Sequence, residues 1–121
     1  MQNAALAYGT VAKQIANPRE LEADLLLKAA ARLQATREAW DRGRPDLDEA
    51  LLYNRKLWSI FLTSVTSTEH PLPVAIRQNV ANLGLFVMNH TVAVLKDPRP
   101  DQLGSLISIN REIAAGLLGR A

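Results

Sequence analysis

The stretch RQNVANLGLFVMNHTVAVLK, residues Arg77–Lys96, decides between a membrane protein and a helical bundle. Between its terminal cations lie eighteen residues that carry no formal charge when His90 is neutral. A membrane-spanning helix needs about 20 mostly apolar residues. This stretch contains three asparagines, a glutamine and a histidine, which would be costly in lipid. We therefore expect a helix packed within protein, without membrane insertion.

Composition narrows the class of protein. The length of 121 residues predicts one domain, residues 1–121. The chain has no cysteine, which excludes a disulfide framework, a thiolate metal site and thiol catalysis. The 14 basic and 12 acidic residues are interleaved, whereas a nucleic-acid-binding protein usually carries a clustered basic stripe. No signal peptide is recognisable. We expect a cytoplasmic protein without direct nucleic-acid contact.

Hydrophobic periodicity predicts five helices and no strand. Asn17 and Asp46 are the expected N-caps of the second and third helices, with Glu20 and Glu49 three residues later. Breaks between helices contain glycine or proline, and Gly119 is the expected stop of the last helix. The expected ranges are 2–16, 18–40, 47–67, 74–95 and 101–118. Short links favour an all-α, antiparallel up-and-down bundle of four long helices plus a short N-terminal helix.

Residues typical of catalysis are sparse. His70 lies next to prolines in the link between two helices and is expected to be exposed. His90 is expected to have a structural or interface role. No histidine pair has metal-ligand spacing, and no nucleophile or phosphate-binding motif is present. The acids Glu20, Glu22, Asp24, Asp48 and Glu49 lie in first turns, where the helix dipole favours them. We expect no enzyme, no metal and no cofactor.

Two asparagines fall within apolar helix faces. Asn54 lies among the apolar residues of the third helix, and Asn110 among those of the fifth. A buried amide is costly unless it is hydrogen-bonded. Two interpretations stay open: each amide finds a partner within the bundle, or each bonds the backbone of a bound guest chain.

The fourth helix divides into two arcs on a helical wheel. One arc, about 200° wide, is apolar, so we expect this helix to touch neighbours on two sides. It contains Ile76, Val80, Leu85, Val87, Met88, Val92, Val94 and Leu95. The other arc holds Phe86 among Asn79, Asn82, Asn89 and His90. An aromatic residue ringed by amides is typical of a contact surface, which either another helix of the bundle or a partner covers.

Four blocks of the chain resemble the FlaF family of flagellar biosynthesis regulators. They are NAALAYGTVAKQIANPRELEADLLLKAAARLQ, ALLYNRKLWSIFLTSV, HPLPVAIRQNVANLGLFVMNHT and LGSLISINREIAAGLLG. The pairing of LYNRKLW with RQNVANLGLFVM is the most specific part. The opening third is also similar to the FliS flagellin export chaperones, which are small antiparallel helix bundles.

The resemblance implies a small cytoplasmic protein that is needed for flagellin production and acts with the regulator FlbT. Monomeric flagellin exposes apolar stripes in its terminal regions, and a helical bundle could cover them by helix-in-groove binding. Our hypothesis is a flagellin-binding chaperone and regulator that supports flagellin synthesis and secretion. The alternatives are a post-transcriptional regulator of flagellin mRNA acting with FlbT, and a self-associating helical adaptor.

The expected flagellin-binding groove lies between the third and fourth helices. Its expected residues are Tyr53, Leu57, Trp58 and Phe61 on the third helix, with Asn79, Leu83, Phe86 and His90 on the fourth. The short first helix, with Tyr8, is expected to cover this groove when it is empty.

Overall fold

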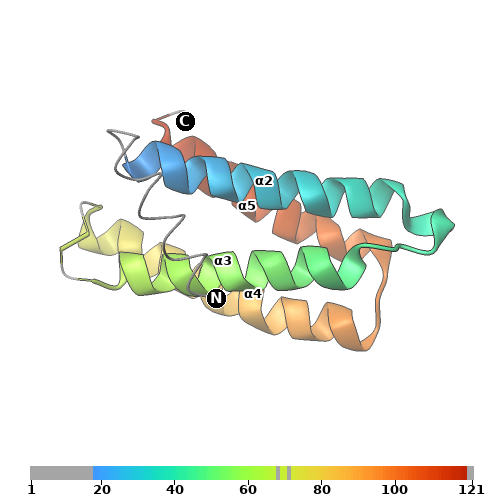
Figure 1. Ribbon diagram of the computed structural model, residues 1–121. Helices are drawn as coiled ribbons and strands as arrows, with labels where there is room; N and C mark the ends of the chain where they lie inside the picture. Colours follow the sequence, from blue (N-terminus) through green and yellow to red (C-terminus); the bar gives the residue numbers. More distant parts are fainter. Residues whose placement is uncertain (1–17, 68, 71, 120–121) are drawn as a thin grey trace, which may run out of the picture.

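The computed structural model describes residues 18–67, 69–70 and 72–119. This part of the chain folds into four α-helices and contains no strand (Figure 1). The helices are α2 (Pro18–Glu38), α3 (Leu47–Val65), α4 (Val74–Lys96) and α5 (Leu103–Leu117), with the short 3₁₀ helices η1 (Trp40–Arg42) and η2 (Pro100–Gln102) between them. The prediction of an antiparallel bundle of four long helices is confirmed. The predicted helix 2–16, with Tyr8, and the predicted cap Asn17 lie outside the described residues.

The helix ends follow the predicted breaks closely. After η1 the chain turns at Gly43, whose φ of +91° lies in the left-handed region that favours glycine. Gly119 has a φ of +75° and its N–H donates to the carbonyl of Gly116, which confirms the expected stop. Asp46 does precede α3, but its side chain makes no capping hydrogen bond, so the predicted cap interaction is wrong.

The four helices form two layers, with α2 beside α5 and α3 beside α4 (Figure 1). The contact between α2 and α5 is the most extensive, and α2 also packs on α3. Alanines permit this approach, because Ala23, Ala30 and Ala114 are buried and take little space between the helices. By contrast, α4 and α5 touch along only a small part of their length.

Helix α4 approaches α3 most closely at Gly84. A Cβ atom built on Gly84 would lie 2.8 Å from Cγ of Leu62, so only glycine fits without a shift of that side chain. The buried face of α4 is narrow and runs through Gly84; its members are Val80, Gly84, Val87, Thr91 and Val94. The hydroxyl of Thr91 donates to the carbonyl of Val87, which satisfies it inside the core.

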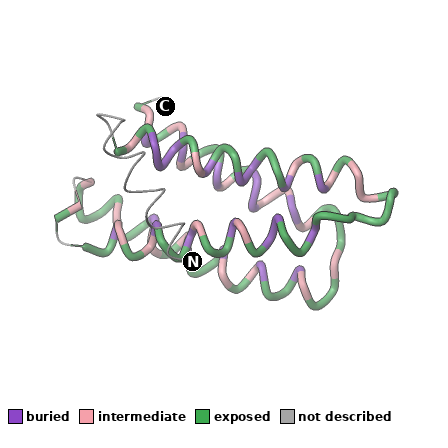
Figure 2. Tube along the Cα trace, in the orientation of Figure 1, coloured by how far each residue is buried: buried purple, intermediate pink, exposed green. Residues whose placement is uncertain are grey.

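As predicted, α4 touches two neighbours, α3 closely and α5 over a small part of its length. The predicted apolar arc is nevertheless not fully buried. Much of α4 is exposed or only half-buried (Figure 2). Ile76, Leu85 and Val92, all within the predicted apolar arc, are exposed. The reason is the position of α4 at a corner of the bundle, where α3 covers one flank and α5 contributes little. The apolar arc of α4 is therefore wider than the surface that the bundle buries.

Candidate partner-binding surface

A hydrogen-bonded chain of side chains occupies the centre of the bundle. Trp58 Nε1 donates to Asn110 Oδ1 at 2.8 Å. Asn110 Nδ2 donates to Asn54 Oδ1 at 2.7 Å and to the Leu26 carbonyl at 3.2 Å. Trp58, Asn54 and Asn110 are all 0% exposed. Each amide thus finds a partner within the bundle, which confirms the first interpretation, although the buried Nδ2 of Asn54 has no hydrogen-bond partner among the described residues. Neither side chain is exposed to a guest chain in this arrangement.

Two of the predicted groove residues belong to this core instead. Trp58 is fully enclosed, and Phe61 packs edge-on against it with ring centroids 5.4 Å apart. Trp58 has no exposed surface that a partner could touch, and Phe61 reaches the surface only at the small pocket that it lines with Leu57. The helical periodicity of the sequence placed both residues correctly on the apolar arc of α3, but that arc faces the core.

Tyr53 and Leu57 lie on the flank of α3 that faces α2. The guanidinium of Arg32 on α2 stacks over the Tyr53 ring, 4.8 Å from its centroid. Leu57 lines a small pocket with Leu25 of α2 and Ile60 of α3. These two residues are half-buried and point away from the flank of α3 that carries Leu62 and meets α4. The predicted groove is therefore split between two sides of the bundle.

The remaining predicted residues come together on the flank of α4 nearest to α5. Phe86 is 44% exposed and stacks on the His90 ring, with centroids 5.0 Å apart and an interplanar angle of 16°. His90 Nε2 lies 2.8 Å from the Gln102 carbonyl and 3.2 Å from Ser105 Oγ. Since a carbonyl only accepts, Nε2 carries a proton and donates to Gln102. The contact fixes the imidazole, and with it the surface on which Phe86 rests.

Helix α5 extends this surface with two isoleucines. Ile109 and Ile113 follow Ser105 at intervals of four residues, so they lie on the same side of α5 as the contact with His90. Both are half-buried and pack against the core. We call this region the α4–α5 surface. It comprises Asn79, Leu83, Phe86 and His90 of α4 with Ile109 and Ile113 of α5.

The opposite flank of α4 carries a second apolar region. It lies beside the buried face of α4, and its members Val74, Leu85 and Val92 are exposed. We call it the outer stripe, and it comprises Val74, Ala81, Leu85, Met88, Val92 and Leu95. Leu85 is 60% exposed and Val92 48% exposed. Four of its members belong to the predicted apolar arc: Met88 and Leu95 are half-buried and pack against the core, whereas Leu85 and Val92 are exposed.

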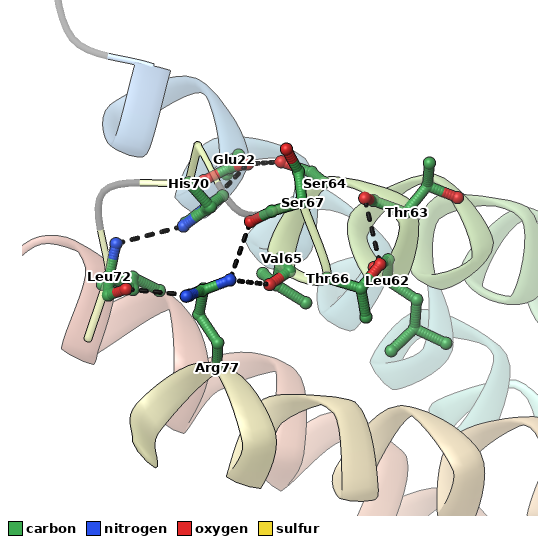
Figure 3. A network of polar contacts seen from close by, with 10 residues as sticks. All are labelled: Glu22, Leu62, Thr63, Ser64, Val65, Thr66, Ser67, His70, Leu72 and Arg77. Atoms are coloured by element: carbon green, nitrogen blue, oxygen red, sulfur yellow. Dashed lines mark hydrogen bonds and ion pairs between the residues drawn. The ribbon is translucent and has the colours of Figure 1, made fainter. Parts of the chain in front are cut away.

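A polar network that sequence reasoning missed joins the α3–α4 link to α2 (Figure 3). Arg77 donates to the carbonyls of Ser67 at 2.7 Å and Leu72 at 2.9 Å, and it reaches that of Val65 at 3.4 Å. It therefore holds the end of α3 and the link against the start of α4. His70 was expected to be exposed, but its side chain is only 6% exposed, so that prediction is wrong.

His70 faces a buried carboxylate from α2. Its Nδ1 accepts the Leu72 N–H at 3.2 Å, and its Nε2 lies 3.8 Å from Glu22 Oε2. The Ser64 hydroxyl donates to the same Glu22 oxygen at 3.4 Å. Burial raises the pKa of Glu22, against smaller opposing effects of Ser64 and Arg19. Burial also lowers the pKa of His70, and the cations Arg77 and Arg19 lower it further. Both shifts disfavour a fully charged pair.

The described residues offer neither a metal-binding group nor a membrane span. No group of three or more His, Asp or Glu side chains among them is arranged to hold a metal ion. None of the helices described has the length and apolar character to cross a membrane. The features on which a function can be built are therefore the two exposed flanks of α4.

Comparison with known proteins supports the resemblance seen in the sequence. A family model described as flagellar protein FlaF matches residues 4–117, a range that includes all four described helices. Comparison with curated proteins and with solved structures gave no match.

Proposed function

The chain belongs to the FlaF family of flagellar proteins, and from this membership we propose that it is a flagellin-binding chaperone and regulator. It would bind monomeric flagellin in the cytoplasm and support its synthesis and secretion during flagellum assembly. The proposed binding site is the α4–α5 surface, which replaces the groove between α3 and α4 expected from the sequence.

The observation that supports this site is the exposed ring of Phe86 on a fixed support. An aromatic side chain held in one place loses little conformational entropy when a partner covers it. His90 provides that support, because the Gln102 carbonyl fixes its imidazole. Phe86 can therefore act as an anchor of the kind that dominates binding energy in protein interfaces.

The surroundings of Phe86 suit an amphipathic helix as the guest. Asn79, Asn82 and Asn89 are exposed along the same side of α4, and their amides can both donate and accept hydrogen bonds. Leu83, on the same side of α4, is half-buried, as are Ile109 and Ile113 on the side of α5 that carries Ser105. A terminal flagellin segment with an apolar stripe would bury that stripe here in the helix-in-groove manner.

The direct test is titration calorimetry of the purified protein with monomeric flagellin. We expect a one-to-one complex with the wild-type chain. Phe86→Ala should raise the dissociation constant by about tenfold or more, since loss of an interface anchor typically costs over about 1.4 kcal/mol. Circular dichroism should show an unchanged helical fold, because Phe86 lies outside the buried core.

Ile60→Ala is the matched control. Ile60 is also an exposed apolar residue, but it lies on α3 beside the pocket that faces α2. Its removal should leave flagellin affinity unchanged. Absence of any complex with the wild-type chain would refute flagellin binding itself. Equal affinities of wild type and Phe86→Ala would refute only the placement on the α4–α5 surface.

The regulatory part of the proposal concerns FlbT, which acts with this family according to the resemblance. We propose that FlbT and flagellin compete for the chain. Adding purified FlbT to the flagellin complex during gel filtration should then release free flagellin. A ternary complex that elutes intact would contradict competition and leave flagellin binding unaffected.

A further inference from the structure

The tautomer of His70 follows from its contact with the backbone. Its Nδ1 accepts the N–H of Leu72 at 3.2 Å. An accepting ring nitrogen carries no proton, so the proton of the neutral imidazole lies on Nε2. The contact has the spacing of an Asx turn, in which a side chain accepts the N–H of the residue two positions later. Unlike the amide oxygen of an asparagine in such a turn, the Nδ1 acceptor can be protonated near neutral pH.

A second proton cannot bind to His70 without breaking this contact. Since Nε2 already carries one proton, the second must bind to Nδ1, toward which the Leu72 N–H points. Two donors would then face each other, and the Leu72 N–H would lose its acceptor. The imidazolium ion therefore does not fit the position that the neutral ring occupies.

The surroundings of His70 also disfavour its positive charge. The side chain is only 6% exposed, so the imidazolium would lose most of its hydration. Arg77 of α4 and Arg19 of α2 repel it, whereas the Glu22 carboxylate of α2 attracts it across 3.8 Å. The Ser64 hydroxyl of α3 donates to Glu22 and adds no charge. Burial and the two cations together lower the pKa of His70, so the attraction of Glu22 does not compensate for them.

Glu22 becomes a weaker counterion as the solution becomes more acidic. Burial raises its pKa, so it loses charge over the range in which His70 gains charge. Solvent offers the imidazolium a better environment, because water hydrates it there and the neighbouring Glu69 is exposed. A protonated His70 is therefore stabilised by leaving its place between the α3–α4 link and α2.

Arg77 and His70 both hold the α3–α4 link, but they respond differently to pH. Arg77 donates to the carbonyls of Ser67 at 2.7 Å and Leu72 at 2.9 Å, and its guanidinium stays charged at every pH in which proteins fold. His70 instead joins the link to Glu22 of α2. Loss of the His70 contacts would therefore free the link from α2 and leave it tied to the start of α4.

We propose that His70 is a proton-sensitive latch. In mildly acidic solution its protonation breaks the hydrogen bond with the Leu72 N–H and releases the α3–α4 link from α2, while the four helices stay folded. Since the pKa of His70 is lowered, the latch is closed above about pH 6.5 and opens as the pH falls through the folded pKa. The residues of the latch lie outside the α4–α5 surface, so the proposal is independent of flagellin binding.

Amide hydrogen exchange of the full chain, followed by nuclear magnetic resonance, tests the latch at Leu72. After correction for the intrinsic pH dependence of exchange, protection of the Leu72 N–H should fall at least tenfold between about pH 7.5 and about pH 5. The Asp97 N–H donates to the Ala93 carbonyl, which does not titrate, so its protection should stay constant. The ring nitrogen shifts of His70 should show a proton on Nε2 alone at the higher pH and on both nitrogens at the lower. Circular dichroism should show the same helicity at both.

Substitutions separate the acceptor from its titration. His70→Asn supplies an amide oxygen two residues before Leu72, and this oxygen does not titrate, so protection of the Leu72 N–H should persist at both pH values. His70→Ala removes the acceptor, so protection should be low at both. His90→Gln is the matched control, since it removes the other histidine and should leave the pH response of Leu72 intact.

Several results would overturn the latch. They are a Leu72 N–H that is unprotected at neutral pH, a His70 that is still neutral at about pH 5, and protection of the Leu72 N–H that survives protonation of the ring. A pH response that persists in His70→Asn would assign the effect to another group and refute the role of His70. Loss of helicity in the wild-type chain over the same pH range would refute a local release.

Discussion

Helices α2 and α4 are similar in length, at 21 and 23 residues, but the bundle buries them very differently. Helix α2 carries eight charged residues, and eight of its positions are buried; α4 carries only Arg77 and Lys96 as charges, and five of its positions are buried. The more apolar helix is thus the less buried one. Apolar content alone does not decide burial, because the neighbours of a helix in the bundle set how much of it can be covered.

The largest effect should come from the same substitution made on both helices. Leu33→Ala on α2 removes a fully buried side chain and should lower the free energy of unfolding by about 2–5 kcal/mol. Leu85→Ala on α4 removes an exposed side chain and should change the free energy of unfolding by less than about 0.5 kcal/mol. Urea unfolding followed by circular dichroism measures both. Similar losses of stability in the two variants would mean that Leu85 on α4 is as deeply packed as Leu33 on α2, which would contradict the difference in burial between the two helices.

A second pair of variants sharpens the comparison at the one place where α4 is tightly packed. Gly84→Ala should lower the free energy of unfolding by about 1–2 kcal/mol, because the added methyl meets the Leu62 side chain. Gly116→Ala on α5 has no heavy atom within 4 Å of the added methyl. It should raise stability by up to about 1 kcal/mol through helix propensity.

The same urea series reports on this pair. The two alanine variants share the gain in helix propensity, so the difference between them isolates the contact with Leu62. If Gly84→Ala is as stable as Gly116→Ala, then α3 and α4 are less closely packed at Gly84 than the structure indicates.

The smallest effect concerns the polar contact between α2 and the link that leads into α4. The pKa of His70 is lowered in the folded chain, so its contribution to stability is present above about pH 6.5 and lost as pH falls through the folded pKa. The pKa of Glu22 is raised, so its contribution is present below about pH 4.5 and lost as pH rises through the folded pKa. The two contributions oppose each other between these limits.

Variants separate the two contributions. The stability of Glu22→Gln relative to wild type should be highest at pH 7–8, where wild type carries a desolvated carboxylate. This gain in stability should shrink toward pH 4.5. His70→Gln should lack the loss of stability below pH 6.5. Thermal unfolding at half-unit pH steps measures both, with expected differences below about 1 kcal/mol. A Glu22→Gln variant whose advantage grows as pH falls would contradict the raised pKa of Glu22.

Sequence reasoning was most successful where a local signal exists. Glycine and proline breaks located the four described helices, and hydrogen bonding inside the bundle was one of the two interpretations left open for Asn54 and Asn110. It was least successful for side chains whose surroundings come from distant parts of the chain. Glu22 and His70 are 48 residues apart, and nothing near either residue indicates that they meet in a buried site.

The residues predicted to form one groove lie on different sides of the bundle for the same reason. A helical wheel shows which residues share a face, but it does not show which neighbour that face meets. Trp58 and Phe61 on α3 share an apolar arc that turned out to face the core. Phe86 lies on a flank that α5 leaves open among the described residues. The wheel grouped the residues of each helix correctly and assigned the faces of α3 and α4 to a single groove wrongly.

The sequence by itself determined an all-α chain, the limits of its helices and the residues that share each helix face, because these depend on backbone propensity and on a period of 3.6 residues. Only the tertiary structure decided which of these faces are covered. Burial depends on which helices become neighbours and how closely they approach, as Gly84 does with Leu62 and the alanines of α2 do with α5. Those distances left α4 with two exposed flanks, one around Phe86 and one along Leu85.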